Sequence, residues 1–225
     1  MTDIAAFDFD GTLTNGGSVF SFLVAVRGTV PVAAASVRLA PRLARAALAG
    51  GTTADRTKEE LFVRVLAGQD SSTVESAAEA FARDHLARRL RTDARRRLDW
   101  HRARGDLVVI VSASPECYVR HVGERLGATG VVATRLEVDG AGRLTGRYEG
   151  HNCRGREKLR RLDEWIAEHG GRADGSTLWA YGNSRGDLAL LGAADVGVNA
   201  GRLGRLGRLS AYPGLEQVTT STGAD

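Results

Sequence analysis

Short apolar runs recur along the chain, and each one is followed by polar residues. The clearest runs cover residues 4–7, 107–111, 131–133 and 177–181, with a further candidate at 195–198. Runs of this length between turn residues are typical of buried strands. Helix-like apolar spacing follows at 116–126, at 157–169 and from residue 188 onward. Strands that alternate with helices predict an α/β fold built on a doubly wound, Rossmann-like parallel sheet.

The stretch after the first run has a different pattern. It carries no strand signal, only segments with helical apolar spacing and many Ala, Leu and Arg residues, at 19–27, 33–48, 57–67 and 72–100. Glycine-containing turns at 50–53 and 68–71 separate these segments. We therefore predict a helical domain at 15–90, inserted into a core that consists of residues 1–14 and 91–225.

Three further segments complete the pattern. Residues 136–146 contain a Gly-rich turn between two short β-like stretches, which predicts a hairpin. Residues 202–209 have a three-residue repeat of Arg, Leu and Gly that is too short for a solenoid, and we interpret it as an accident of composition. The tail at 219–225 is predicted to be frayed.

Composition sets broad limits. The 225 residues are 43% hydrophobic, which is enough for a core in one or two domains. The net charge is +4, and of the 31 Lys and Arg residues only Lys58 and Lys158 are lysines. The cysteines, Cys117 and Cys153, and the lack of a signal-like N-terminus predict packed free thiols in a reducing cytoplasm. No apolar run approaches the roughly 20 residues that span a bilayer.

The arginines leave the choice of partner open. Arg38, Arg42 and Arg45 share one face of a predicted helix, which suits either an anionic lipid surface or simple solvation, and we favour solvation. The cluster at 95–97 is also interpreted as a solvated helix face. It has no interleaved aromatic residues for base stacking, so nucleic-acid binding is not predicted.

The first candidate catalytic residues follow the apolar run at residues 4–7. Asp8 and Asp10 project to the same side of an extended segment, and Gly11 permits a sharp turn directly after them. Two nearby carboxylates suit a hard divalent cation and a carboxylate nucleophile. The alternative is an acidic turn without chemistry, since Asp and Gly are ordinary turn residues.

Two other runs end in polar loops of the same kind. Ser112 follows the run at 107–111, whereas Asn183 and Asp187 follow the run at 177–181. Ligands of open α/β sheets bind outside the carboxyl ends of the strands, so these loops should meet there. With Lys158 at the start of the preceding helix, the set suits a phosphoryl group beside Mg²⁺.

These residues resemble a known family. The stretches DFDGTLT, SAS, GREK and YGNSRGD resemble, in order, the four motifs of the haloacid dehalogenase-like (HAD) hydrolase superfamily. The insertion between the first two resembles the helical C1 cap of that family. The stretch TRLEVDGAGRLTGRYEGHNCRGREK is similar to subfamily IB, the phosphoserine phosphatase-like branch.

The resemblance implies roles for single residues. Asp8 would be the nucleophile that forms an aspartyl-phosphate, and Asp10 the general acid and base. Ser112 would hold a phosphate oxygen, and Lys158 would neutralise negative charge. The implied metal ligands for Mg²⁺ are Asp8, Asp10 (through its backbone carbonyl), Asn183 and Asp187. The implied substrate contacts are Gly11, Thr12, Ser112 and Ala113. Arg56 and Lys58 of the predicted cap are further candidates for substrate contacts, and the alternative for each is a solvated side chain.

The chain departs from the family pattern at two positions. Asn183 stands where the family usually has Asp, which removes a negative charge from the metal site and predicts weaker Mg²⁺ binding or a crippled enzyme. Phosphoserine phosphatases carry a Glu nine residues beyond the nucleophile, to receive the substrate ammonium. Here that position is Gly17, and no acid follows before Asp55. L-Phosphoserine is therefore not the expected substrate.

We expect a Mg²⁺-dependent phosphatase that acts on a small phosphomonoester. The alternatives are a phosphotransferase or mutase of the same family, a lipid-phosphate phosphatase and a non-catalytic phosphoryl-binding regulatory protein. The basic helix face motivates the lipid alternative, and Asn183 motivates the regulatory one.

Overall fold

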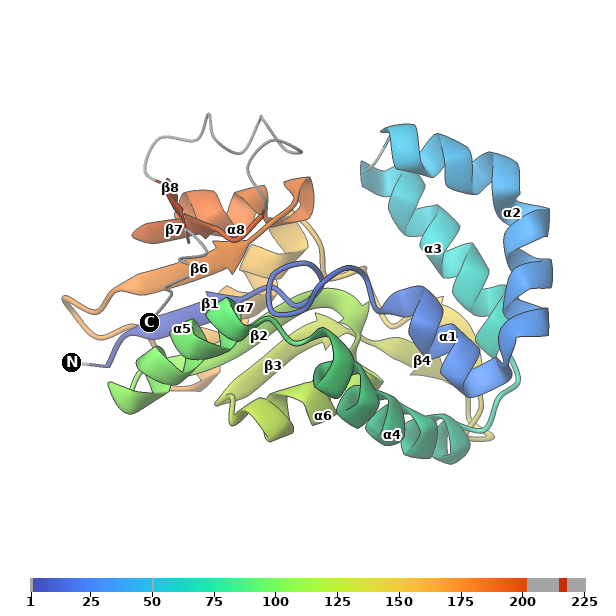
Figure 1. Cartoon of the computed structure of the whole chain (residues 1–225), viewed down its shortest axis with the longest axis horizontal. Coiled ribbons are helices and arrows are strands. Elements are labelled where there is room, and N and C mark those ends of the chain that lie inside the picture. The colour runs from blue at the N-terminus through green and yellow to red at the C-terminus, as the bar shows by residue number, and fades with distance from the viewer. Residues whose placement is uncertain (1, 50, 202–214, 218–225) are drawn as a thin grey trace, which may run out of the picture.

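The computed structural model describes residues 2–49, 51–201 and 215–217. Within them, a parallel sheet forms the centre of the molecule (Figure 1). Its strands are β1 (Ile4–Phe7), β2 (Leu107–Pro115), β3 (Gly130–Thr134), β6 (Leu178–Gly182), β7 (Val196–Asn199) and β8 (Leu215–Gln217). They lie in the order β3-β2-β1-β6-β7-β8, which is 3-2-1-4-5-6 when the parallel strands are numbered along the chain. This is the doubly wound order that the sequence predicts.

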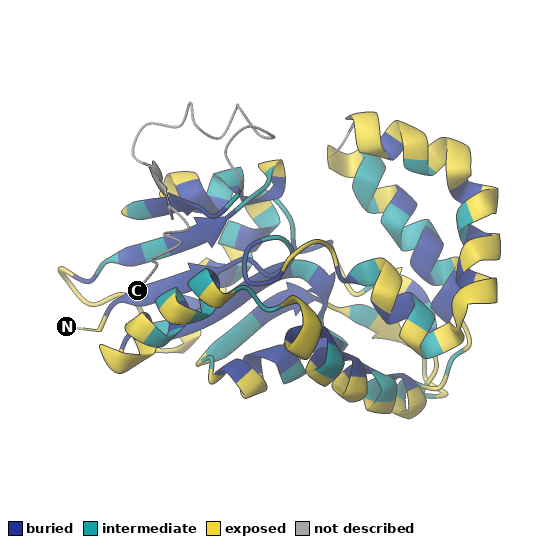
Figure 2. Cartoon of the chain, in the orientation of Figure 1, coloured by how far each residue is buried: buried dark blue, intermediate teal, exposed yellow. Residues whose placement is uncertain are grey.

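Helices cover both faces of the sheet because side chains of β1 alternate between two cores. Ala5 and Phe7 point into one core, which α5 (Thr92–Ala103) and α6 (Glu116–Leu126) close. Ile4 and Ala6 point into the other, which α7 (Arg156–Glu168) and α8 (Leu188–Ala193) close. Figure 2 shows the central strands as the most deeply buried part of the chain. Strands buried on both faces have no polar alternation, as the sequence pattern indicates.

Four helices separate β1 from α5. They are α1 (Val19–Arg27), α2 (Thr29–Ala49), α3 (Gly51–Leu66) and α4 (Ser71–Arg89). The predicted turn at 50–53 is wrong over residues 51–53, which already belong to α3. Helix α4 lies along α6, whereas α2 packs on α3 at the outer end of the molecule (Figure 1).

The single helix predicted at 72–100 is also wrong, because Leu90 and Arg91 are extended and divide it into α4 and α5. The Arg91 N–H donates to the Leu13 carbonyl over 2.9 Å, and the Asn15 N–H donates to the Arg89 carbonyl over 2.8 Å. Pairing with the loop after β1 therefore outweighs helix propensity at this point. The segment that leaves the core after β1 and the segment that returns to it before α5 therefore lie side by side.

A hairpin connects the sheet region to α3. Strands β4 (Leu136–Val138) and β5 (Leu144–Tyr148) are antiparallel, which confirms the predicted hairpin. Gly146 of β5 has φ +78°, and a Cβ there would lie 2.5 Å from the Cα of Val63 in α3. The glycine thus permits close contact between hairpin and helix.

No helix among the described residues is long and apolar enough to cross a membrane. The predictions for 202–209 and 219–225 concern segments outside the described residues.

Candidate active site

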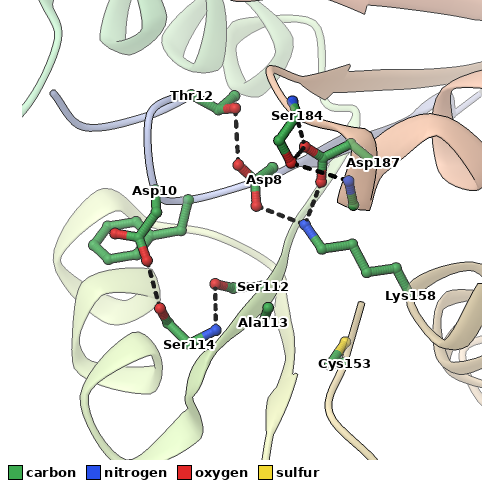
Figure 3. A network of polar contacts seen from close by, with 12 residues as sticks. Asp8, Asp10, Thr12, Ser112, Ala113, Ser114, Cys153, Lys158, Ser184 and Asp187 are labelled. Carbon is green, nitrogen blue, oxygen red and sulfur yellow. Dashed lines mark hydrogen bonds and ion pairs between the residues drawn. The ribbon is translucent and has the colours of Figure 1, made fainter. Parts of the chain in front are cut away.

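The sequence-predicted side chains meet at the carboxyl ends of three adjacent strands (Figure 3). β1 pairs with β2 on one side and with β6 on the other, with Phe7 opposite Ile110 and Tyr181. The residues that follow these positions therefore emerge at one edge of the sheet. Lys158 reaches the same point from the first turn of α7.

A buried lysine joins two carboxylates at the centre of the site. The Lys158 Nζ lies 2.5 Å from Oδ1 of Asp8 and 2.6 Å from Oδ1 of Asp187. The side chains come from α7, from the loop after β1 and from the short 3₁₀ helix η1 (Arg185–Asp187) after β6. Lys158 and Asp187 are each 1% exposed and Asp8 is 6% exposed, so water screens this cluster little.

Burial and charge set the acidity of these groups. Burial raises the pKa of Asp8 to about 7, repulsion from Asp187 adds to the effect, and Lys158 opposes it. Burial also acts on Asp187, but Lys158 and Ser184 outweigh it and hold the pKa of Asp187 below its usual value. Burial disfavours the Lys158 ammonium, yet the two carboxylates raise its pKa above the usual range. The lysine therefore stays charged.

The loop after β1 wraps around Asp8. The Thr12 hydroxyl donates to Oδ2 of Asp8 over 2.9 Å, so both carboxylate oxygens are bound. Gly11 has φ +83°, and a Cβ on it would lie 2.0 Å from Nδ2 of Asn183. Only glycine satisfies this backbone angle and this contact together. The first and fourth motifs are therefore packed directly on each other.

Asp10 belongs to a separate network of hydroxyl groups. Its Oδ2 accepts hydrogen bonds from Ser18 over 2.9 Å and from Ser114 over 2.5 Å, and Ser18 lies 2.7 Å from the hydroxyl of Tyr118. Oδ1 of Asp10 is buried and has no hydrogen-bond partner among the described residues. Burial raises the pKa of Asp10, although these hydrogen bonds lower it. One carboxylate thus contacts an ammonium, while the other is held by neutral donors.

The second motif borders both networks. Ser112 is buried inside β2, because the strand continues to Pro115; the predicted polar loop directly after residue 111 is therefore wrong. The Ser112 Oγ accepts the Ser114 N–H over 3.0 Å. The carbonyl of Ala113 accepts from Lys58 Nζ and from Thr134 Oγ1, each over 2.8 Å. Lys58 therefore extends from α3 to the sheet edge, and burial lowers its pKa to about 8.

Arg56 does not share this position. It is exposed, and it lies two residues before Lys58 on α3, so the two side chains leave different sides of the helix. A substrate contact by Arg56 stays a prediction.

A family model of haloacid dehalogenase-like hydrolases matches residues 5–192. The chain is a haloacid dehalogenase-like hydrolase. The match includes all four motifs and the helices between the first two. It confirms the family that the sequence resemblance implies.

Relatives of this haloacid dehalogenase-like hydrolase include protein CicA of Caulobacter vibrioides. CicA is 35% identical over 195 residues, which cover 85% of this chain and 83% of the relative. A histidinol-phosphatase of Neisseria meningitidis is 34% identical over 97 residues, 40% of this chain and 41% of the relative.

Two solved structures share the fold. A protein of unknown function from Bordetella pertussis Tohama I has a TM-score of 0.81 at 25% identity and covers 97% of this chain and 99% of its own. The structure of a phosphoserine phosphatase as a phospho-aspartyl intermediate analogue has a TM-score of 0.61 at 21% identity. This match covers 88% of the present chain and 86% of the phosphatase. The fold is therefore that of phosphoserine phosphatase-like hydrolases of the family.

The oxygen donors at this edge fit a hard cation. Oxygens of Asp8 and Asp187 converge on one ammonium, and the Asn183 Oδ1 is buried with no hydrogen-bond partner in the part of the chain that the structure describes. Magnesium in proteins takes carboxylate and carbonyl oxygens of this kind. Among the described residues no three Asp, Glu, His or Cys side chains cluster as metal ligands. A cation at this edge would therefore need the amide oxygen of Asn183 in addition to the carboxylates.

Other groups that surround these residues are not evident from the sequence pattern. Ser18, Ser114 and Tyr118 hold Asp10, and Asn152 accepts from Lys58 over 2.6 Å. Ser114 lies within the SAS motif and was the one group with a local signal. The others come from separate elements, so only the fold brings them to the site.

Proposed function

We propose that this hydrolase is a Mg²⁺-dependent phosphatase that cleaves a small phosphomonoester through an aspartyl-phosphate on Asp8. The convergence of Asp8, Lys158 and Asp187 from distant segments carries the proposal, because an anionic nucleophile needs nearby positive charge to approach an anionic phosphate. The similarity to a histidinol-phosphatase and the phosphoserine phosphatase fold support it.

In the first half of the proposed reaction, an oxygen of Asp8 attacks phosphorus and the bond from phosphorus to the leaving oxygen breaks. Asp10 gives its proton to that oxygen, and its raised pKa favours the protonated form that this step needs. Lys158 and the Ser112 hydroxyl offset charge on the phosphoryl oxygens. The Thr12 hydroxyl, 2.9 Å from Asp8, orients the nucleophile.

In the second half, water attacks the phosphorus of the aspartyl-phosphate. Asp10, now ionised, accepts the proton from that water, and the bond between phosphorus and Asp8 breaks. Ser18 and Ser114 hold the Asp10 carboxylate in place for both transfers. The products are inorganic phosphate and the alcohol, and the enzyme returns to its initial state.

The metal ligands in this proposal are Asp8, the backbone carbonyl of Asp10, Asn183 and Asp187. When bound, Mg²⁺ supplies positive charge that stabilises the phosphoryl oxygens. Lys158 supplies the same sign of charge from the protein itself.

We propose that helices α1–α4, within residues 15–90, act as a cap that shields the site from water and selects the substrate. Gly17 offers no carboxylate to an ammonium group, and Asp55 already accepts from Nδ2 of Asn152 over 2.6 Å. This pattern argues for a phosphomonoester other than L-phosphoserine.

The test is hydrolysis of an aryl phosphate by the purified chain and by Asp8→Asn. We expect Mg²⁺-dependent release of phosphate that falls by roughly 10³-fold or more in the variant, since the nucleophile is lost. Rapid-quench mass spectrometry should detect a phosphate adduct on Asp8. Turnover that survives Asp8→Asn would contradict the mechanism, and no turnover of any phosphate ester would favour a non-catalytic phosphoryl-binding protein.

Product analysis distinguishes the remaining alternatives. Release of inorganic phosphate that is unaffected by added alcohols supports hydrolysis, whereas transfer to an alcohol would identify a phosphotransferase or mutase. A screen over sugar, amino-alcohol, nucleotide and lipid phosphates would then define the leaving group.

A further inference from the structure

Helix α2 lies in a part of the chain that has no acidic side chain. Between Asp10 and Asp55 there is not one Asp or Glu, although the whole chain has 27. The charged residues of this stretch are all arginines, and three of them, Arg38, Arg42 and Arg45, lie on α2. The charged side chains of α2 are therefore all positive, and this helix lies at the outer end of the molecule (Figure 1).

The side of α2 that faces away from the protein is apolar. Val30 is 78% exposed, Val37 74% and Leu48 88%. At 100° per residue these three lie within about 20° of one another around the helix. Val32 and Leu39, which are buried, lie on the opposite side. The helix thus has two apolar sides, and only one of them is covered by the described residues, as the exposed outer side in Figure 2 shows.

We name Val30, Val37 and Leu48 the outward stripe. Large exposed apolar side chains in a row mark surfaces that bind something, whereas single ones are ordinary. Ala44 and Pro41 lie between members of the stripe and are also exposed, so no polar side chain interrupts it.

The arginines flank the outward stripe on one side, about 60–120° around the helix. All three are exposed, and Arg42 contacts Glu60 of α3. Two copies of the chain that paired through this face would bring arginines together without acidic partners on α2. An anionic, apolar surface matches the charge and the stripe at once.

We propose that the outward face of α2 docks on an anionic lipid bilayer, with the outward stripe in the headgroup–acyl boundary and Arg38 and Arg45 on lipid phosphates. A helix that combines an apolar side with basic residues lies in the plane of the interface. Arginine suits the position because its stem packs on apolar groups while its guanidinium binds phosphate oxygens. The proposal is independent of the proposed phosphatase activity.

The test is flotation of the whole chain with vesicles of phosphatidylcholine alone and of phosphatidylcholine with phosphatidylglycerol. We expect binding only to the anionic vesicles, weakened by salt. The double variant Arg38→Gln and Arg45→Gln should bind about 25-fold more weakly, at about fivefold per arginine. Val37→Asp with Leu48→Asp should abolish binding.

The matched control is Arg88→Gln with Arg96→Gln, which removes the same charge from exposed positions on α4 and α5. This control variant should bind vesicles like the unaltered chain. Circular dichroism should show the same melting temperature for it and for the Arg38→Gln, Arg45→Gln variant. The proposal would be overturned if the two double Arg→Gln variants weakened vesicle binding equally, or if the unaltered chain did not bind anionic vesicles. A dimer in solution that Val37→Asp with Leu48→Asp dissociates, without vesicle binding, would show instead that this face joins two copies.

Discussion

At the scale of single residues, the site gives different surroundings to two carboxylates that lie two positions apart in the sequence. Asp8 contacts Lys158, whereas Asp10 is held by Ser18 and Ser114. Different surroundings give the two groups different chemistry. A carboxylate beside an ammonium suits a nucleophile, and a buried one with neutral donors suits proton transfer.

Loss of the Ser114 hydroxyl should impair proton transfer more than substrate binding. In Ser114→Ala we expect kcat to fall by about 10- to 100-fold with KM nearly unchanged, because a hydrogen bond to a charged group contributes about 1.5–3 kcal/mol. The pH profile of kcat should shift with it. Ser176→Ala is the control, since the buried Ser176 hydroxyl bonds to no group within residues 2–49, 51–201 and 215–217. A pure KM effect in Ser114→Ala would contradict a positioning role.

The amide of Asn183 should limit the affinity for Mg²⁺. In Asn183→Asp we expect about tenfold tighter binding by calorimetry, because affinity rises with the charge of the ligands. Without metal the variant should melt at a lower temperature, since a further carboxylate then lies near Asp8 and Asp187. Asn15→Asp makes the same change in an exposed loop. An equal response of both variants to Mg²⁺ would argue against Asn183 as a ligand.

At the scale of elements, Lys58 connects α3 to the end of β2. Its ammonium donates to the Ala113 carbonyl and to Asn152, and the same Nζ lies 5.9 Å from the ring centroid of Phe62 and 5.6 Å from that of Tyr148. This contact joins the proposed cap to strand β2, which holds Ser112. Substrate selection and phosphate binding would therefore be mechanically linked.

Removal of that ammonium should loosen α3. Lys58→Met keeps the apolar stem, so we expect faster amide hydrogen exchange along α3 and unchanged exchange in the sheet. Arg56→Met, on the same helix but exposed, should leave exchange as it is. Unchanged exchange in Lys58→Met would mean that packing alone holds the helix.

Much of this arrangement could be predicted from sequence, because parallel strands end at a common edge. That rule placed Asp8, Ser112 and Asp187 together. The break at Leu90 and Arg91 could not be predicted, since neither residue disfavours a helix and the cause is pairing with a distant loop. Nor does periodicity show which apolar side of α2 is covered, because both sides have helical spacing.

At the scale of the whole molecule, a buried histidine links three segments of the core. His101 of α5 lies 2.7 Å from Oδ2 of Asp106, just before β2, and 2.8 Å from the Tyr181 hydroxyl in β6. The geometry assigns the proton to Nδ1, which donates to Asp106, while Nε2 accepts from Tyr181. Burial lowers the pKa of His101 below its usual value, so the folded chain holds it neutral.

Stability should therefore decrease as the medium becomes mildly acidic. Below about pH 6.5 the unfolded chain binds a proton at His101 that the folded chain does not, and each pH unit costs up to about 1.4 kcal/mol. Urea unfolding of the chain and of His101→Phe measures this, with a shallower slope expected for the variant. Ring ¹⁵N shifts should show neutral His101 in the folded chain near pH 6. Equal slopes and a charged ring would contradict the assignment.

The pairing of residues 13–15 with residues 89–91 beside β1 has an evolutionary consequence. Because Asn15 pairs with Arg89 and Leu13 with Arg91, the two ends of the segment that carries α1–α4 are tied together at one place, so this segment can change in length without moving the point at which the chain re-enters the core. Changes in these helices that keep the contacts of Ser18 with Asp10 and of Lys58 with Ala113 would then alter the proposed substrate selection and leave the strand ends in place.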